Sequence, residues 1–361
     1  MKSENKIFIK SFDFNKLFRK LLIIIPIGVI GNILFSLYTS DKAMLPSLIN
    51  FSYGYFLLAI ILTIIPWLTN ALRILIWTQF LGKGVSFCNI LKIVLGTDLG
   101  AAISPTAVGG APVKIGMLVQ EGGISTGIAT SITFLANIED NLFAFLAVPF
   151  ALTVSSSWEL PILKAIFYKM YIPFIWTISG LVFIIIASLL ILKIKHRFKI
   201  KTKIKFLSKC SFYEKFNRKV KDFWSDFKSV YYLIAKKGKF RFLISMGLTS
   251  IQWICRFSVI SALLISLNIA VEPIRFFALQ WFVFTLMNFV PTPGAAAGAE
   301  ATFYLIFKSF FPSEVIGLIT TGWRFLTFYF LLILGAILII LLNMPKKFLF
   351  KKIKRLSIQY Y

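Results

Sequence analysis

Two proline- and glycine-rich stretches decide the fold: ISPTAVGGAPVK at residues 103–114 and FVPTPGAAAGAEA at residues 289–301. They interrupt two apolar segments in the middle, one at 89–121 and the other at 274–311. Neither half of either segment is long enough to cross a bilayer, which takes about 20 apolar residues. Irregular backbone at membrane depth is tolerated only where protein or water covers it. We therefore predict that both segments are re-entrant hairpins, each made of two half-helices.

Six further apolar runs are long enough to cross a membrane as helices, which rise about 1.5 Å per residue. They lie at 21–38, 55–80, 126–153, 170–192, 243–267 and 314–343. Of the 361 residues 58% are hydrophobic, whereas soluble domains are about 45–50% apolar. We predict an all-α polytopic membrane protein, with one membrane domain over residues 1–361. It has about six transmembrane helices, the first of them retained and not cleaved as a signal peptide, plus the two hairpins.

The net charge of +26 is concentrated in three blocks of the sequence. Of the 40 Lys and Arg residues, 6 lie within 1–20, 17 within 193–241 and 6 within 346–355. Cationic loops are retained on the cytoplasmic side of a membrane, and the predicted helices place all three blocks on one side. The pattern predicts a multi-pass protein of the inner (plasma) membrane with cytoplasmic N- and C-termini. This charge distribution argues against a nucleic-acid partner. The alternative is that the segment 193–241 has a separate role in binding RNA or lipid.

The basic segment 193–241 also contains an amphipathic helix with a Lys-rich face. Its apolar residues recur at steps of three and four: Phe216, Val220, Phe223, Phe227, Val230 and Ile234. We predict that this helix lies along the inner membrane surface. Packing against a soluble partner is the alternative.

Few residues of this chain can support catalysis or bind a metal ion. The three cysteines, Cys88, Cys210 and Cys255, have no CxxC spacing, and the one histidine, His196, lies in the basic segment. The sequence contains no Walker A motif. We expect no catalytic residues, no metal and no cofactor. Any driving force for transport is then a gradient, the membrane potential or downhill flow.

The two halves of the chain repeat each other. Residues 55–153 and 243–343 each contain a helix with an intramembrane Arg, a broken hairpin, and a helix with a charge deep inside. Aligning Pro105 with Pro291, an offset of 186 residues, places Lys114 of one half on an acidic residue of the other. The two units cross the membrane in opposite senses, which predicts an inverted-topology repeat. In transporters built this way, broken helices of both repeats form the substrate site near the midplane.

Ionisable residues inside transmembrane segments are rare and often mark functional sites. The candidate substrate-binding residues are therefore the intramembrane charges: Arg73, Lys114, Glu139, Asp140, Arg256, Glu300 and Arg324. We expect the cations to contact an anionic head group and the carboxylates to act as counter-charges or as proton or cation sites. Asp98 and Glu121 add two carboxylates near the first hairpin.

The signs of these charges predict pairing of Lys114 with Glu139 and Asp140, and of Glu300 with Arg324. The structural alternative is that such pairs only hold hairpin to helix. A second candidate set marks the hairpin turns: Pro105, Gly109, Gly110, Pro291, Gly294 and Gly298. Their glycines could expose backbone N–H groups to an anionic head group or allow close helix packing.

Several of these stretches resemble the transmembrane domain of lysylphosphatidylglycerol synthases. They are ALRILIWTQFLG from residue 71, the run 96–140, PTPGAAAGAEATFYL from residue 291 and WRFLT from residue 323. The family's second-half pattern is matched by Pro291, Gly294, Gly298, Glu300, Arg324 and Thr327. In the first half this chain departs from the family, with Ala111–Pro112 and Lys114 after the glycines and Glu139–Asp140 in the next helix.

The resemblance implies a domain that moves aminoacylated phospholipid to the outer leaflet, and stand-alone members are described as flippase-like membrane proteins. The family's synthase activity belongs to a separate soluble domain. The chain ends 18 residues after the last predicted helix, so we expect that domain to be absent and the protein not to be an enzyme.

We therefore expect a translocase for a phospholipid or polyprenyl-linked lipid, with membrane lipids bearing anionic or aminoacylated head groups as partners. An intramembrane lipid-modifying enzyme and a non-transporting scaffold for a cytoplasmic partner are the alternatives. The sequence leaves open whether the chain forms a homo-oligomer.

Overall fold

The computed structural model describes four long ranges of the chain, 51–104, 110–161, 211–287 and 298–343, together with residues 26, 30, 31 and 164. For 211–220, 313 and 314 only the backbone is described. Several features predicted from the sequence lie outside these ranges: almost all of 21–38, all of 170–192, the basic tail, and the turn residues Pro105, Gly109, Pro291 and Gly294.

The regular elements within the described ranges are helical, and four of their helical segments are long and apolar enough to cross a membrane. They are α2 (Tyr53–Phe80), α5 (Thr126–Val154), α8 (Lys239–Ser266) and the segment Val315–Asn343. A helix satisfies its backbone hydrogen bonds internally, as a bilayer requires. The helical polytopic membrane class predicted from the sequence is therefore confirmed.

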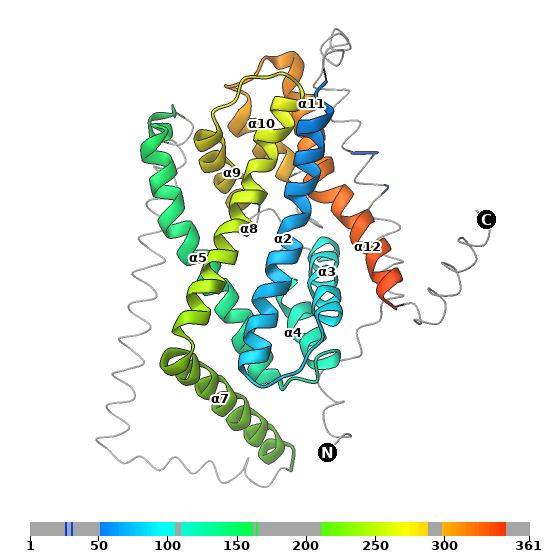
Figure 1. Cartoon of the computed structure of the whole chain (residues 1–361), viewed down its shortest axis with the longest axis vertical. Coiled ribbons are helices and arrows are strands. Elements are labelled where there is room, and N and C mark those ends of the chain that lie inside the picture. The colour runs from blue at the N-terminus through cyan, green and yellow to red at the C-terminus, as the bar shows by residue number, and fades with distance from the viewer. Residues whose placement is uncertain are drawn as a thin grey trace, which may run out of the picture.

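The central helix pair consists of α2 and α8, which run antiparallel (Figure 1). At one end the Ser52 backbone N–H donates to the Ser266 carbonyl at 2.8 Å. Toward the other end, Trp77 Nε1 donates to Ser245 Oγ at 3.2 Å. Ser245 and Thr249 of α8 are fully buried, and small side chains of this kind let transmembrane helices approach closely.

A shorter antiparallel pair, α3 (Phe87–Ile103) and α4 (Gly110–Gln120), occupies the first predicted hairpin segment. An ion pair of 3.1 Å between Lys92 and Glu121 joins their outer ends. Gly100 allows the close approach of the two helices, because a Cβ there would lie 2.6 Å from a methyl group of Val113.

The second predicted hairpin segment contains α9 (Pro273–Met287) and α10 (Gly298–Phe307). This pair lies toward the other end of the α2–α8 pair (Figure 1). Arg275, near the start of α9, donates to the Ser155 carbonyl just after α5 at 3.0 Å. Both helix pairs follow the order that the inverted-repeat interpretation requires. Re-entrance itself stays a prediction, because the residues that join each pair lie outside the described ranges.

The sequence predicted a single helix for the last membrane-crossing segment, but the structure interrupts the α-helix with a π-helical turn. The segment consists of α11 (Ser313–Arg324), a π-helical turn at Phe325–Tyr329 and α12 (Phe330–Asn343). Such π-turns are rare and occur frequently at functional sites. This one directly follows the intramembrane Arg324.

The amphipathic helix predicted within the basic segment is α7 (Ser211–Lys237). Its apolar residues Val230 and Ile234 are buried. The ring of Phe134 on α5 lies 6.1 Å from that of Phe227 and 6.3 Å from that of Tyr231. Burial raises the pKa of Tyr231 to about 12. The apolar face of α7 is therefore used for packing against the protein.

The α7–α5 contact is closest at the start of α5. Ser125 Oγ donates to Asp226 Oδ2 at 2.5 Å. A Cβ on Gly127 would lie 2.6 Å from the Cβ of Asp226 and 2.9 Å from the Phe223 carbonyl oxygen. A side chain at position 127 cannot fit without moving α7.

We expect Gly127→Leu to displace α7 from α5, because the new side chain would overlap the backbone of α7. Limited trypsin digestion in detergent should then cleave at Lys221 and Lys228 at least several times faster than in the wild type. Gly247→Leu is the matched control, since a Cβ at this helical glycine meets no atom within 4 Å. Equal cleavage rates in Gly127→Leu and the wild type would contradict the packing described.

Candidate functional site

A buried arginine on α2 holds two adjacent carboxylates of α5. Arg73 donates to Glu139 Oε2 from Nε at 3.0 Å and from Nη2 at 2.7 Å. Its Nη1 donates to Asp140 Oδ1 at 2.9 Å. Arg73 is 2% exposed and Glu139 is fully buried. A guanidinium can bind two carboxylates at once because its donors form a fixed planar fork.

Three further side chains complete this cluster. Gln252 Oε1 on α8 accepts from Arg73 Nη1 at 3.1 Å. Trp77 Nε1 donates to Glu139 Oε1 at 3.3 Å. Trp253 Nε1 donates at 3.1 Å to Asp140 Oδ1, the oxygen that also accepts from Arg73 Nη1. We name these six side chains the Arg73 network: Arg73, Trp77, Glu139, Asp140, Gln252 and Trp253. The network joins α2, α5 and α8.

The pairing of Lys114 with Glu139 and Asp140 that the sequence suggested is wrong. Both carboxylates bind Arg73, and Lys114, 7% exposed, forms no ion pair within salt-bridge distance in the part of the chain described. The physical reason is that α2 packs against α5 and brings a fork-shaped donor to two neighbouring carboxylates. Lys114 interacts with these charges and with Asp98 only over a longer distance.

We expect Arg73→Gln to lower the free energy of unfolding by about 3–5 kcal/mol, the usual cost of breaking a buried ion pair. The reason is that Glu139 and Asp140 would lose their cation inside the membrane. Thermal denaturation of the detergent-purified protein measures the effect. The double variant Arg73→Gln/Glu139→Gln should recover part of the loss, since it removes one uncompensated charge. A single variant that melts with the wild type would show that the network does not hold the helices together.

The second intramembrane ion pair joins α10 to α11. Arg324 Nε donates to Glu300 Oε1 at 3.2 Å, and the two residues are 3% and 5% exposed. The sequence predicted this pairing, and the structure contains it. The guanidinium of Arg324 also lies 3.9 Å from the ring centroid of Phe328. Glu300 sits in the first turn of α10, where a negative charge is favoured by the helix dipole.

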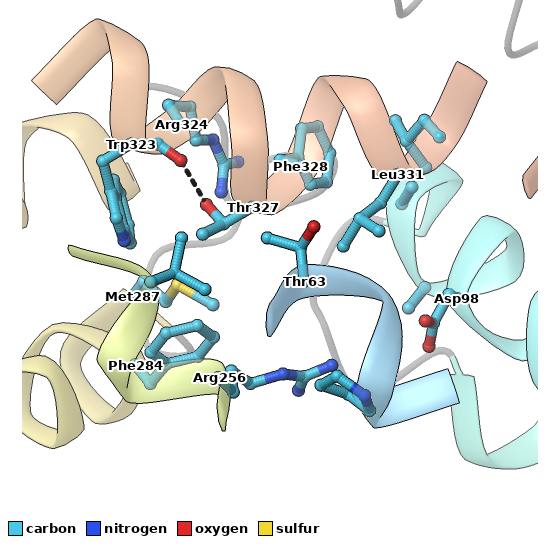
Figure 2. A pocket seen from close by; sticks show the side chains of 15 residues that line it. Thr63, Asp98, Arg256, Phe284, Met287, Trp323, Arg324, Thr327, Phe328 and Leu331 are labelled. Atoms are coloured by element: carbon cyan, nitrogen blue, oxygen red, sulfur yellow. Dashed lines mark hydrogen bonds between the residues drawn. The ribbon is translucent and has the colours of Figure 1, made fainter. Parts of the chain in front are cut away.

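Arg256 and Arg324 line a pocket of about 160 Å³ between the two halves of the chain. Residues from α2, α3, α8, α9, α11, the π-turn and α12 contribute to it. Figure 2 shows the side chain of Arg256 stretched from α8 toward α2, with Asp98 of α3 beyond it. The opposite wall is the segment around the π-turn, with these residues facing the space: Trp323, Arg324, Thr327, Phe328 and Leu331.

Arg256 differs from the other intramembrane arginines in its surroundings. Its guanidinium lies 5.4 Å from the ring centroid of Trp253 and 5.8 Å from that of Phe284. Across the described ranges it has no carboxylate within salt-bridge distance, and Asp98 reaches it only as a longer-range charge. An aromatic ring can stabilise a cation by about 0.5–2 kcal/mol, less than the several kcal/mol that an ion loses when it is desolvated. Arg256 is therefore suited to receive an anion.

Asp98 gives the pocket a carboxyl group. Its Oδ2 accepts a hydrogen bond from Trp67 Nε1 at 2.7 Å, which fixes the orientation of the carboxyl group. The pocket thus offers two guanidinium groups, of which that of Arg324 is paired with Glu300, and one carboxyl group. A head group that carries a phosphate and an amine matches Arg256 and Asp98.

The structure divides the residues predicted for the site. Arg256 and Arg324 line the pocket, whereas Arg73, Glu139 and Asp140 belong to the Arg73 network. Of the predicted turn glycines within the described ranges, Gly110 begins α4 and Gly298 begins α10, and both are buried. Among the described residues, the acidic, cysteine and histidine side chains form no group of three or more that could hold a metal ion.

Several pocket residues were not selected from the sequence. Thr63, Trp323 and Phe328 were missed, whereas Asp98 was noted only as a carboxylate near the first hairpin and Thr327 only within the family pattern. Asp98 could have been chosen as an acidic residue within an apolar run. Trp323 and Thr327 are four residues apart and share a helix face, but nothing in the sequence places that face at the pocket.

Comparison with known proteins relates this chain to a family of membrane proteins. The model of the family described as "Lysylphosphatidylglycerol synthase TM region" matches residues 20–335. The chain belongs to this family. It is also similar to a UPF0104 membrane protein of Archaeoglobus fulgidus, with 25% identity over 290 residues, which cover 78% of this chain and 84% of the relative. The family assignment made from the sequence motifs is confirmed, and the chain is a multi-pass membrane protein.

Proposed function

We propose that this protein is a flippase-like lipid translocase. The pocket between the two halves receives the polar head group, while the acyl chains stay in the bilayer. The observation that carries the proposal is Arg256, an arginine in a membrane-embedded pocket without a close carboxylate among the described residues. Intramembrane cations of this kind mark substrate pathways. The synthase-related family supports lipid as the substrate class.

The lining of the pocket supports a head group with both charges. A phosphate is placed against Arg256, and Arg324 lies nearby with part of its charge balanced by Glu300. An amine is placed against Asp98. We therefore propose phospholipids with anionic or aminoacylated head groups as substrates. The cavity of about 160 Å³ suits a head group and not a whole lipid.

The π-turn is the proposed site of a conformational change during transport. Backbone hydrogen bonds are less regular there than in an α-helix, and the turn directly follows the ion-paired Arg324. We propose that α12 shifts relative to α11 at this point when the head group enters or leaves. We propose that the protein lies in the cytoplasmic membrane with α7 and both termini on the cytoplasmic side, because its cationic blocks then obey the positive-inside rule.

The test is leaflet scrambling of fluorescent lipids in proteoliposomes. The wild type should move an anionic or an aminoacylated phospholipid, and Arg256→Gln should slow this at least about tenfold, as expected for losing a charged hydrogen bond. Asp98→Asn should slow the aminoacylated lipid more than a purely anionic one. Both variants should unfold at the same temperature as the wild type, which shows that the loss of transport is not a loss of folded protein.

Arg241→Gln is the matched control, because Arg241 lies on the same helix as Arg256 but is exposed and outside the pocket. It should transport lipid at the wild-type rate. If the wild type moves none of the fluorescent phospholipids, or if Arg256→Gln moves them as fast as the wild type does, phospholipid translocation through this pocket is wrong.

A further inference from the structure

The face of α7 that points away from α5 carries a stripe of lysine and aromatic side chains. Its members are Lys221, Trp224, Lys228 and Tyr232, spaced by three, four and four residues, which places them on one side of a helix. Trp224 is 52% exposed and Tyr232 is 65% exposed. Both lysines are exposed as well. We name these four residues the α7 stripe.

The α7 stripe lies at the level where the membrane-crossing helices end. One residue, Gly238, separates α7 from α8, and α7 packs on the first turns of α5 (Figure 1). Phe80, at the end of α2, lies at the same level, since the guanidinium of Arg241 near the start of α8 is 4.7 Å from its ring centroid. A helix held at the ends of three membrane-crossing helices lies beside the lipid head groups.

The chemistry of the α7 stripe fits this level of the bilayer. Trp and Tyr are enriched at membrane–water interfaces, where their amphipathic rings lie among the head groups. Each Lys or Arg near an anionic membrane surface adds about 1 kcal/mol of attraction. Asp226 lies off the stripe, because it accepts a hydrogen bond from Ser125 of α5. Asp222 is exposed beside the stripe, but the exposed lysines Lys221, Lys228 and Lys236 outnumber it. The charge on the exposed face is therefore positive.

We propose that the α7 stripe is a binding surface for anionic phospholipid head groups of the adjacent leaflet. The lysines bind the phosphates while Trp224 and Tyr232 insert among the head groups. Because the opposite face of α7 is packed on α5, this lipid contact braces the helix that carries Glu139 and Asp140. The proposal does not depend on lipid translocation through the pocket.

The test uses the full-length protein in nanodiscs and measures quenching of Trp224 by brominated lipids. The signal of Trp224 is the difference between the wild type and Trp224→Phe. Brominated phosphatidylglycerol should quench this signal more strongly than brominated phosphatidylcholine at the same fraction. In Lys221→Gln/Lys228→Gln the preference of Trp224 quenching for phosphatidylglycerol over phosphatidylcholine should fall about fivefold or more for each lysine removed.

The matched control, Lys164→Gln/Lys308→Gln, removes two exposed lysines that follow α5 and α10, away from α7. It should keep the wild-type preference for phosphatidylglycerol. Equal quenching of wild-type Trp224 by the two lipids would overturn the proposed charge selectivity. Absence of quenching by either lipid would show that the stripe faces water, as a docking face for an acidic soluble protein would.

Discussion

The fold depends on the burial of one guanidinium, that of Arg73, among side chains of three membrane-crossing helices. A charge at the centre of a membrane helix costs about 2.5–3.5 kcal/mol on insertion scales. Arg73 offsets this cost by binding Glu139 and Asp140 of α5 and Gln252 of α8. Satisfying its donors therefore requires α2, α5 and α8 to meet at one depth. This requirement fixes the central pair, and the shorter helix pairs pack around it.

The intramembrane charges consequently have two different roles. Those of the Arg73 network are bound to one another, and Arg73 and Glu139 are buried while Asp140 is partly exposed. This arrangement suits them to a structural role. The pair Glu300–Arg324 is intermediate, since it joins α10 to α11 and also borders the pocket. Arg256 and Asp98 face the pocket, where a ligand can reach them. A translocase needs both structural charges and pocket charges, because the helices that move during transport must shift relative to a rigid pair of central helices.

Within the described ranges, hydrophobicity alone predicted the bounds of several helices closely. The runs 55–80 and 126–153 became α2 and α5 within two residues at each end, because about 20 apolar residues can satisfy a bilayer only as a helix. Partner choice was less predictable, because which helices pack together decides which charges meet. For that reason Lys114 was paired from the sequence with Glu139 and Asp140, the two carboxylates that in fact bind Arg73. The π-turn and the docking of α7 on α5 also depend on packing between residues far apart in the sequence.

The most direct test of the division between network and pocket is photo-crosslinking with a phospholipid that carries a diazirine next to its head group. Crosslinked peptides from the full-length protein in nanodiscs are mapped by mass spectrometry. The account predicts adducts near Asp98, near Arg256 and on the π-turn segment that lines the pocket. Adducts confined to the outer surfaces of α5 and α12, with none at these three places, would contradict it.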